Sequence, residues 1–186
     1  MLLFQYLDFL PAIPSELLVE PGINNNDYIK QPDERHKQLP AHRRATFARY
    51  SVNEQVLNWL RDNISTSLEL AGLQKMTWPD DAISGTRLII PHTDAARHWA
   101  ISYIFETGGP NVTTTFYQEH GFPLVRKSDT LFKGDNLTVH EQFVIEPYRW
   151  HMIKTNVIHG VENVLTQRQA ISIGLITDDP LSLIKT

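Results

Sequence analysis

A histidine and an aspartate stand one residue apart at the end of an apolar run. The apolar residues 88–90 lead into His92 and Asp94, and a second apolar run begins at Trp99. An imidazole and a carboxylate so placed can bind one divalent metal ion together. They can equally form a hydrogen bond to each other at a strand end, and such a pair often arises by chance. The pair therefore gains meaning only with partners elsewhere in the chain.

A second histidine and an arginine near the C-terminal end supply candidate partners. His159 lies in one strand-like segment, and Arg168 begins the next, a spacing that fits a hairpin. Alternation along the last strand puts Arg168 on one face with the small residues Ala170, Ser172 and Gly174. An arginine on such a face would point into space left open for a ligand, although an arginine at a strand start can also be solvated.

The order and spacing of His92, Asp94, His159 and Arg168 resemble those of the Fe(II)/2-oxoglutarate-dependent dioxygenases. The resemblance covers roughly residues 84–177 and implies that family's double-stranded β-helix, a jelly-roll, cupin-like fold. It implies His92, Asp94 and His159 as the catalytic Fe(II) ligands, the 2-His-1-carboxylate facial triad. It also implies Arg168 as the partner of the far carboxylate of the cosubstrate 2-oxoglutarate, because a guanidinium is planar and always charged.

The activity that the resemblance implies is an oxygenation. A 2-oxoglutarate-dependent dioxygenase consumes O2, releases succinate and CO2, and hydroxylates an unactivated C–H bond. The expected substrate is a small molecule or a peptide, such as a free amino acid, a peptide side chain or a small metabolite. The sequence does not choose among these.

The chain departs from the family pattern beside the arginine. Many members carry Ser or Thr two residues after it, where this chain has Ala170, and Ser172 follows on the same face. We expect Ser172 or Tyr103 to assist Arg168 in binding the cosubstrate. Alternation near residue 100 leaves open whether Tyr103 or Ser102 points inward.

Two other interpretations remain open. A cupin-like β-barrel could bind a metal or small ligand without using 2-oxoglutarate, and a structural jelly-roll would bind no metal. Arg168 separates the first from the oxygenase, because a cupin has no need of it. If His92 were not a ligand, His151 would be the first substitute to test.

A basic run at residues 42–49 contains Arg43, Arg44 and Arg49. Such a run usually forms a solvated face. The alternative is that it holds an anionic substrate or partner near the mouth of the active site.

The elements that position these residues are short strands. Seven are predicted, separated by turn signals such as "GGPN", "HGFP" and "KGDN", at 86–91, 98–105, 112–118, 137–145, 149–154, 157–164 and 169–177. Before them, an apolar stripe at residues 56–64 predicts a helix that begins after Ser51 or Asn53. We expect a mainly β fold with N-terminal helices. Residues 1–83 would form an N-terminal α+β extension packed on the catalytic core at 84–186, in one structural unit.

Composition sets the broader limits. A chain of 186 residues with 41% hydrophobic and 20% charged residues is ordinary for one globular domain. The net charge of −4 argues against a general nucleic-acid-binding protein, and no apolar run approaches the ~20 residues that span a bilayer. The absence of cysteine excludes disulfides and fits a reducing compartment. With no basic segment at the N-terminus, the expected location is the cytoplasm, and the oligomeric state cannot be read from the sequence.

Overall fold

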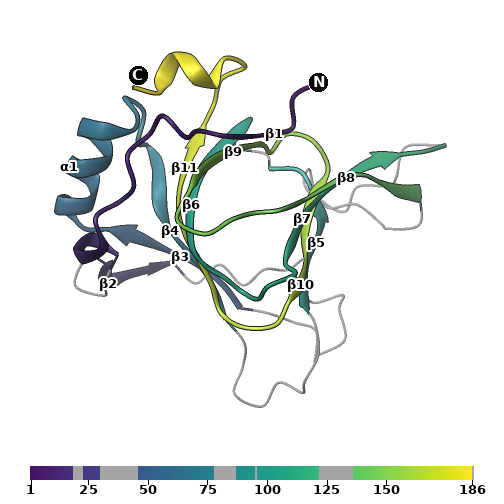
Figure 1. Ribbon diagram of the computed structural model, residues 1–186, viewed down its shortest axis with the longest axis horizontal. Coiled ribbons are helices and arrows are strands. Elements are labelled where there is room, and N and C mark those ends of the chain that lie inside the picture. The colour runs from purple at the N-terminus through teal and green to yellow at the C-terminus, as the bar shows by residue number, and fades with distance from the viewer. Residues whose placement is uncertain (19–22, 30–45, 78–86, 95, 122–135, 186) are drawn as a thin grey trace.

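The structure, a computed structural model, describes residues 1–18, 23–29, 46–77, 87–94, 96–121 and 136–185. In these residues the chain is mainly β, with two antiparallel sheets that lie opposite each other as in a β-sandwich (Figure 1). The larger sheet has the order β1 (Phe4–Tyr6), β9 (Trp150–Lys154), β6 (Trp99–Thr107), β11 (Arg168–Leu175), β4 (Leu70–Thr77), β3 (Thr46–Val52), β2 (Ile23–Ile29). The smaller has the order β5 (Arg87–His92), β10 (His159–Val164), β7 (Thr113–Glu119), β8 (Leu137–Val144).

The seven strands predicted in the second half of the chain match β5 to β11 to within two residues at each end. Turn residues account for this agreement, because they interrupt the chain wherever a strand ends. Gly108 and Gly109, for example, have φ values of 87° and 138° in the turn between β6 and β7. Such positive angles are readily adopted only by glycine.

The helix predicted at residues 56–64 is present, but the further N-terminal helices that the sequence predicts are not seen in the described residues. The described part of the N-terminal half holds one α-helix, α1 (Glu54–Asn63), and one short 3-10 turn at Ser15–Leu17. Asn53 is the N-cap of α1, and its side chain accepts a hydrogen bond from the backbone N–H of Val56 at 3.0 Å. Other described N-terminal residues contribute β1 to β4.

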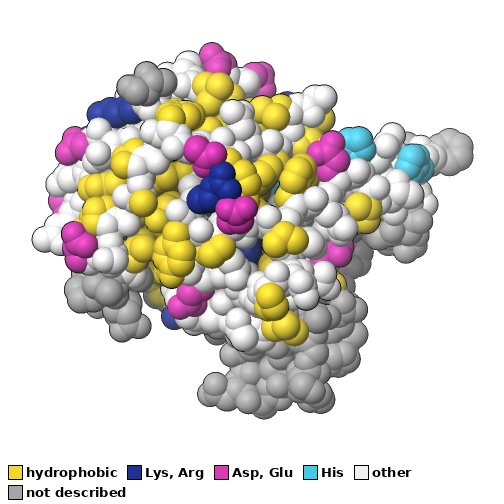
Figure 2. Space-filling model, in the orientation of Figure 1, with side chains coloured by type: hydrophobic (Ala, Val, Ile, Leu, Met, Phe, Trp, Pro, Cys, Tyr) yellow, Lys and Arg dark blue, Asp and Glu magenta, His cyan; other side chains and the backbone are white. Residues whose placement is uncertain are grey.

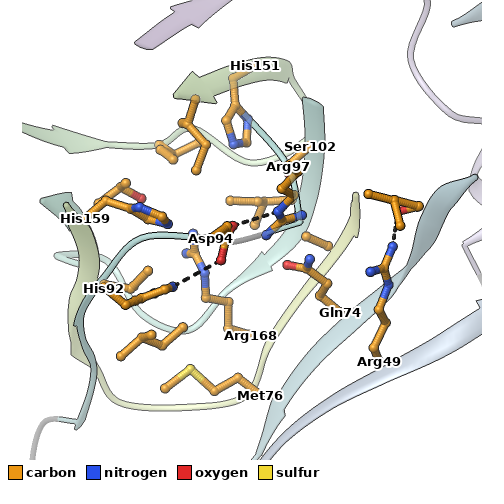
Figure 3. Close-up of a pocket in the computed structure, with 18 of the residues that line it drawn as sticks. Arg49, Gln74, Met76, His92, Asp94, Arg97, Ser102, His151, His159 and Arg168 are labelled. Carbon is orange, nitrogen blue, oxygen red and sulfur yellow. Dashed lines mark hydrogen bonds and ion pairs between the residues drawn. The ribbon is translucent and has the colours of Figure 1, made fainter. Parts of the chain in front are cut away.

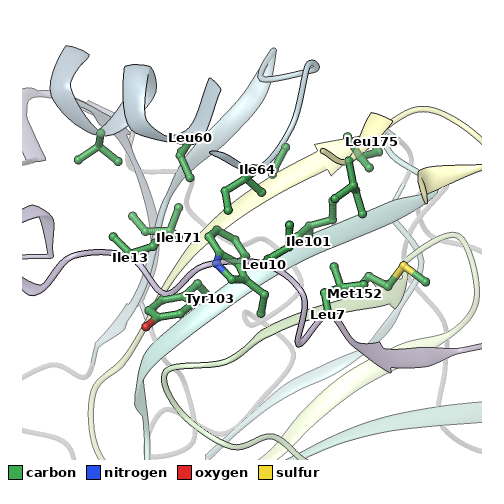
Figure 4. Packing of buried hydrophobic residues seen from close by; sticks show 14 of the residues in the cluster. Leu7, Leu10, Ile13, Leu60, Ile64, Ile101, Tyr103, Met152, Ile171 and Leu175 are labelled. Atoms are coloured by element: carbon green, nitrogen blue, oxygen red, sulfur yellow. The ribbon is translucent and has the colours of Figure 1, made fainter. Parts of the chain in front are cut away.

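The hydrophobic core lies on the outer face of the larger sheet. Leu60 of helix α1 and Ile64, which directly follows the helix, pack above Ile101 of β6 and Ile171 of β11 (Figure 4). The segment after β1 runs across the same face and adds further apolar side chains, namely Leu7, Leu10 and Ile13. This covering leaves the opposite face of the larger sheet turned toward the smaller sheet.

The surface carries no strong bias of charge on the face seen in Figure 2, where acidic and basic side chains are interspersed with hydrophobic and uncharged ones. Within the described ranges, none of the helices has the length and apolar character required to cross a bilayer.

Candidate metal centre

A cavity of about 330 Å³ lies between the two sheets and is lined by side chains of both. Its size is near the lower limit for small-molecule sites. Three kinds of group line it: histidines, charged or amide side chains, and apolar residues. The polar and charged members are Arg49, Gln74, His92, Asp94, Arg97, Ser102, Thr114, His151, His159 and Arg168, most of them labelled in Figure 3.

Two of the histidines come from neighbouring strands of the smaller sheet. His92 ends β5 and His159 begins β10, and the two residues pair directly in the antiparallel ladder. Their ring centroids are 4.5 Å apart. Strand pairing therefore brings together two imidazoles that are far apart in the sequence.

Backbone carbonyls fix both imidazoles in the same way. Nδ1 of His92 lies 2.8 Å from the carbonyl oxygen of Ile90, and Nδ1 of His159 lies 2.9 Å from that of Val157. Because a carbonyl oxygen only accepts hydrogen bonds, each neutral ring must carry its proton on Nδ1. Nε2 then keeps its lone pair, which is the state in which an imidazole binds a metal.

Asp94 completes the group from the loop that follows β5. Its Oδ1 lies 3.6 Å from Nε2 of His92, and its Oδ2 accepts a 2.7 Å hydrogen bond from Nε of Arg97. Its backbone N–H also donates to the carbonyl oxygen of Thr155 at 2.8 Å, which fastens the loop. Burial acts to raise the pKa of this carboxyl, but Arg97, His159 and His92 together hold the pKa below its ordinary value. Asp94 is therefore ionised at neutral pH.

The three side chains fit a metal ion of the Fe(II) type. One ligand atom from each of His92, Asp94 and His159 lies within 4.8 Å of the others, and in the described part of the chain this is the one such group found. Two imidazole nitrogens and one carboxylate oxygen form the donor set of the facial triad, which leaves further coordination positions open.

Arg168 points into the same cavity from the larger sheet (Figure 3). Its Nη1 donates a 2.8 Å hydrogen bond to the carbonyl oxygen of Thr107. Burial lowers the pKa of its guanidinium to about 10, so the group stays charged at neutral pH. No acidic side chain among the described residues forms an ion pair with it. A buried cation without an acidic partner is costly, and an anionic ligand would relieve that cost.

Tyr103 does not lie in the cavity, so the expectation that it assists Arg168 is wrong. It is 2% exposed in the hydrophobic core, where its ring centroid lies 5.1 Å from that of Trp150. The alternation of β6 turns Ser102 inward instead. Ser172 is fully buried, and its hydroxyl lies 3.0 Å from that of Ser102 and 3.4 Å from Nη1 of Arg97. It thus supports the cavity wall beside Arg97, and no hydrogen bond joins it to Arg168 within the described structure.

The sequence did not predict that Arg97, Gln74 and His151 line the cavity. Arg97 and Gln74 gave no signal, since neither belongs to a recognisable motif. His151 lies in β9, is 1% exposed, and has Nδ1 3.4 Å from the carbonyl oxygen of Arg149. The pKa of His151 is lowered to about 3, mainly by burial, and the charge of Arg168 contributes in the same direction. This imidazole is neutral at ordinary pH.

No protein-family model matches the chain, and no curated protein sequence is significantly similar to it. Within the structure, His92, Asp94, His159 and Arg168 all line one cavity. A proposal for the function therefore rests on the chemistry of that cavity.

Proposed function

We propose that this chain is an Fe(II)- and 2-oxoglutarate-dependent oxygenase. It would hydroxylate an unactivated C–H bond of an amino acid, a peptide side chain or a small metabolite, with release of succinate and CO2. The observation that carries the proposal is the pairing of a 2-His-1-carboxylate group with a half-buried arginine, to which the described residues offer no acidic partner, in one small cavity. The two-sheet fold is compatible with the double-stranded β-helix that the proposal requires.

The metal would be held by Nε2 of His92, Nε2 of His159 and Oδ1 of Asp94. When bound, Fe(II) would supply the reaction with O2 that amino-acid side chains cannot perform. The protein's own contribution is orientation: two backbone carbonyls hold the imidazoles in the ligand tautomer. Arg97 occupies Oδ2 of Asp94 and so leaves Oδ1 for the metal.

Arg168 would bind the carboxylate of 2-oxoglutarate that is remote from the metal. Its Nη1 is anchored on the carbonyl oxygen of Thr107, so the guanidinium is held in place before the ligand arrives. Apolar side chains beside it, including Ile104 and Ala170, limit the access of water to the ion pair. A cation buried in this manner favours a dianionic cosubstrate over a neutral ligand.

The first test is an anaerobic titration of the protein with Fe(II) and then 2-oxoglutarate. Chelation of iron by the oxo-acid should give a weak metal-to-ligand charge-transfer band in the visible. The band should be absent in Asp94→Ala, and Arg168→Gln should need about 10- to 100-fold more 2-oxoglutarate, because a charge-assisted ion pair is lost. Arg149→Gln is the matched control, because Arg149 is paired with Asp8 and Glu146 outside the cavity.

The second test is succinate release in air across amino acids, peptides and small metabolites, with mass spectrometry for the gain of one oxygen atom. His92→Ala, Asp94→Ala and His159→Ala should each abolish iron-dependent release. Iron binding without the visible band would favour the cupin-like alternative instead. Full activity in Asp94→Ala would overturn the proposal.

A further inference from the structure

A second cation lies at the end of the cavity remote from His159. Arg49 of β3 and Gln74 of β4 line this end, and Figure 3 shows them on the side of the cavity opposite to His159. Nη2 of Arg49 donates a hydrogen bond to the carbonyl oxygen of Leu70, and no acidic side chain in the described ranges forms an ion pair with it. Within the described ranges the side chain is thus anchored at one nitrogen, and its other donors have no acidic partner there.

The larger sheet makes room for this arginine with a glycine. A Cβ atom on Gly72 of β4 would lie 3.0 Å from Nε of Arg49 and 2.9 Å from the carbonyl oxygen of Tyr50. Gly174 on the adjacent strand β11 does the same for Arg97, whose Cδ would lie 2.9 Å from an added Cβ. Two neighbouring strands therefore have glycine at the positions where the two arginine side chains cross them. This indicates that the sheet is shaped to hold both arginines in the cavity.

The charges of the cavity do not balance. Three arginines and one aspartate line it, so its net charge is +2 with the histidines neutral and before any metal is added. Arg97 is paired with Asp94 at 2.7 Å, and Arg168 is assigned to 2-oxoglutarate. Among the described lining residues, Arg49 is the cation without an assigned anion. Burial and the charge of Arg97 lower its pKa, while the charge of Asp94 acts to raise it.

We infer that the end of the cavity formed by Arg49 and Gln74 binds a carboxylate of the substrate, so that the substrate is a small carboxylic acid, such as a free amino acid. This rests on the proposed function, since it takes Arg168 as the site of the cosubstrate. One guanidinium and one amide supply donors for a single planar carboxylate. A cavity of about 330 Å³ that also holds 2-oxoglutarate limits the substrate to a small molecule.

The test is a binding panel on protein loaded with Mn(II) and 2-oxoglutarate, read by thermal shift and calorimetry. The panel consists of L-amino acids and short-chain carboxylic acids, each beside its carboxamide. At least one acid should bind, and its carboxamide should bind at least tenfold more weakly. Arg49→Gln should weaken that acid at least tenfold, with the dissociation constant of 2-oxoglutarate changed less than threefold. Arg168→Gln should weaken binding of 2-oxoglutarate and leave binding of the acid nearly unchanged. Arg149→Gln should change neither dissociation constant.

A second variant covers the case in which Arg49→Gln does not fold. Gln74→Glu keeps the size of the side chain and places a carboxylate beside Arg49, so it should also weaken the acid at least tenfold. Carboxamides that bind as tightly as the acids, a panel in which no acid binds, or loss of 2-oxoglutarate rather than of the acid in Arg49→Gln would each overturn the inference. If wild-type protein with metal binds no 2-oxoglutarate, the proposed function fails, and the same acid and carboxamide pairs on metal-loaded protein alone decide the inference separately.

Discussion

Each ligand side chain of the candidate metal centre is oriented by a second contact on its far side. The two imidazoles use Nδ1 for a backbone carbonyl two residues earlier in the chain, so their tautomer is set by the strand itself. Asp94 depends instead on a side chain, since Arg97 donates to its Oδ2. The carboxylate is therefore the ligand whose orientation a single substitution can remove.

Replacing Arg97 should weaken metal binding without removing a ligand. Arg97→Gln loses the charge that holds Asp94, and contacts of this kind are typically worth 10- to 100-fold in metal affinity. Equilibrium titration with Mn(II), followed by electron paramagnetic resonance, measures the effect. Arg97→Lys keeps the charge and should recover part of the affinity, which a purely structural role would not require. Unchanged affinity in Arg97→Gln would show that Asp94 is held by its backbone contact with Thr155 instead.

His151 should make the stability of the protein depend on pH. Its pKa is about 3 in the folded chain and 6.5 when unfolded, so only the unfolded chain takes up the proton between these values. The contribution of His151 to the free energy of unfolding is therefore fully present above pH 6.5. As the pH decreases from 6.5 toward 3, the free energy of unfolding falls by about 1.4 kcal/mol per pH unit. Urea unfolding of wild type and His151→Gln between pH 4.5 and 7.5 should show a flatter profile for the variant. Parallel profiles would mean that His151 is protonated in the folded state.

At the scale of residues, what the sequence predicts depends on whether a signal is local. His92 and Asp94 are a local pair. The spacing from His159 to Arg168 predicts a hairpin, and that prediction is wrong, because β10 and β11 belong to different sheets and do not pair. Both residues could still be singled out, since the two sheets face each other across the cavity. Arg49 and Gln74 enter the cavity from strands that precede the pair, and no spacing relates them to it. Tyr103 was misjudged because either phase of β6 presents a plausible hydroxyl, and only the packing of its other face against the core selects Ser102.

At the scale of elements, the close approach of β5 and β10 brings His92 and His159 together. Gly160 follows His159 on β10, and a Cβ atom there would lie 2.7 Å from the carbonyl oxygen of Ile89 on β5. A side chain at this position would push the two strands apart. The glycine is therefore part of the means by which the sheet sets the distance between the imidazoles.

Gly160→Ala should lower both stability and metal affinity. Overpacking against backbone costs about 1–3 kcal/mol of unfolding free energy, and displacement of β5 would separate the two imidazoles. Chemical denaturation and Mn(II) titration measure the two effects. Gly72→Ala is the matched control, because its added Cβ also meets a backbone carbonyl but lies on β4. It should lose a similar amount of stability and keep its metal affinity. Unaltered metal affinity in Gly160→Ala would show that the strands tolerate the separation.

The elements that the sequence predicts are those with turn residues at both ends. Strands β5 to β11 meet this condition, as does α1 with its N-cap Asn53. Strand β4 was missed because both of its faces are covered. Leu73 packs into the core on one side, while Leu70 and Met76 line the cavity on the other. A strand buried on both sides lacks the alternation of apolar and polar residues by which a strand is recognised.

At the scale of the whole molecule, the cavity exists only because two sheets contribute to it. The imidazoles belong to the smaller sheet, and Arg168, Gln74 and Arg49 belong to the larger one. Strands β3 and β4 lie in the first part of the chain, yet they pair in series with β11. Which strands pair over such distances is decided by packing and by chain closure, and neither leaves a local pattern in the sequence.

Ligands that bridge the two sheets should stabilise the molecule cooperatively. A metal alone would join β5, β10 and the loop of Asp94, whereas 2-oxoglutarate bound to that metal and to Arg168 would link the sheets. A ligand at 100 times its dissociation constant adds about 2.7 kcal/mol to the free energy of unfolding. Calorimetric melting should show a rise with Mn(II), a further rise with 2-oxoglutarate, and little effect of 2-oxoglutarate alone. Arg168→Gln should keep the first rise and lose most of the second, and Asp94→Ala should lose both. A second rise retained in Arg168→Gln would mean that 2-oxoglutarate does not link the sheets through that arginine.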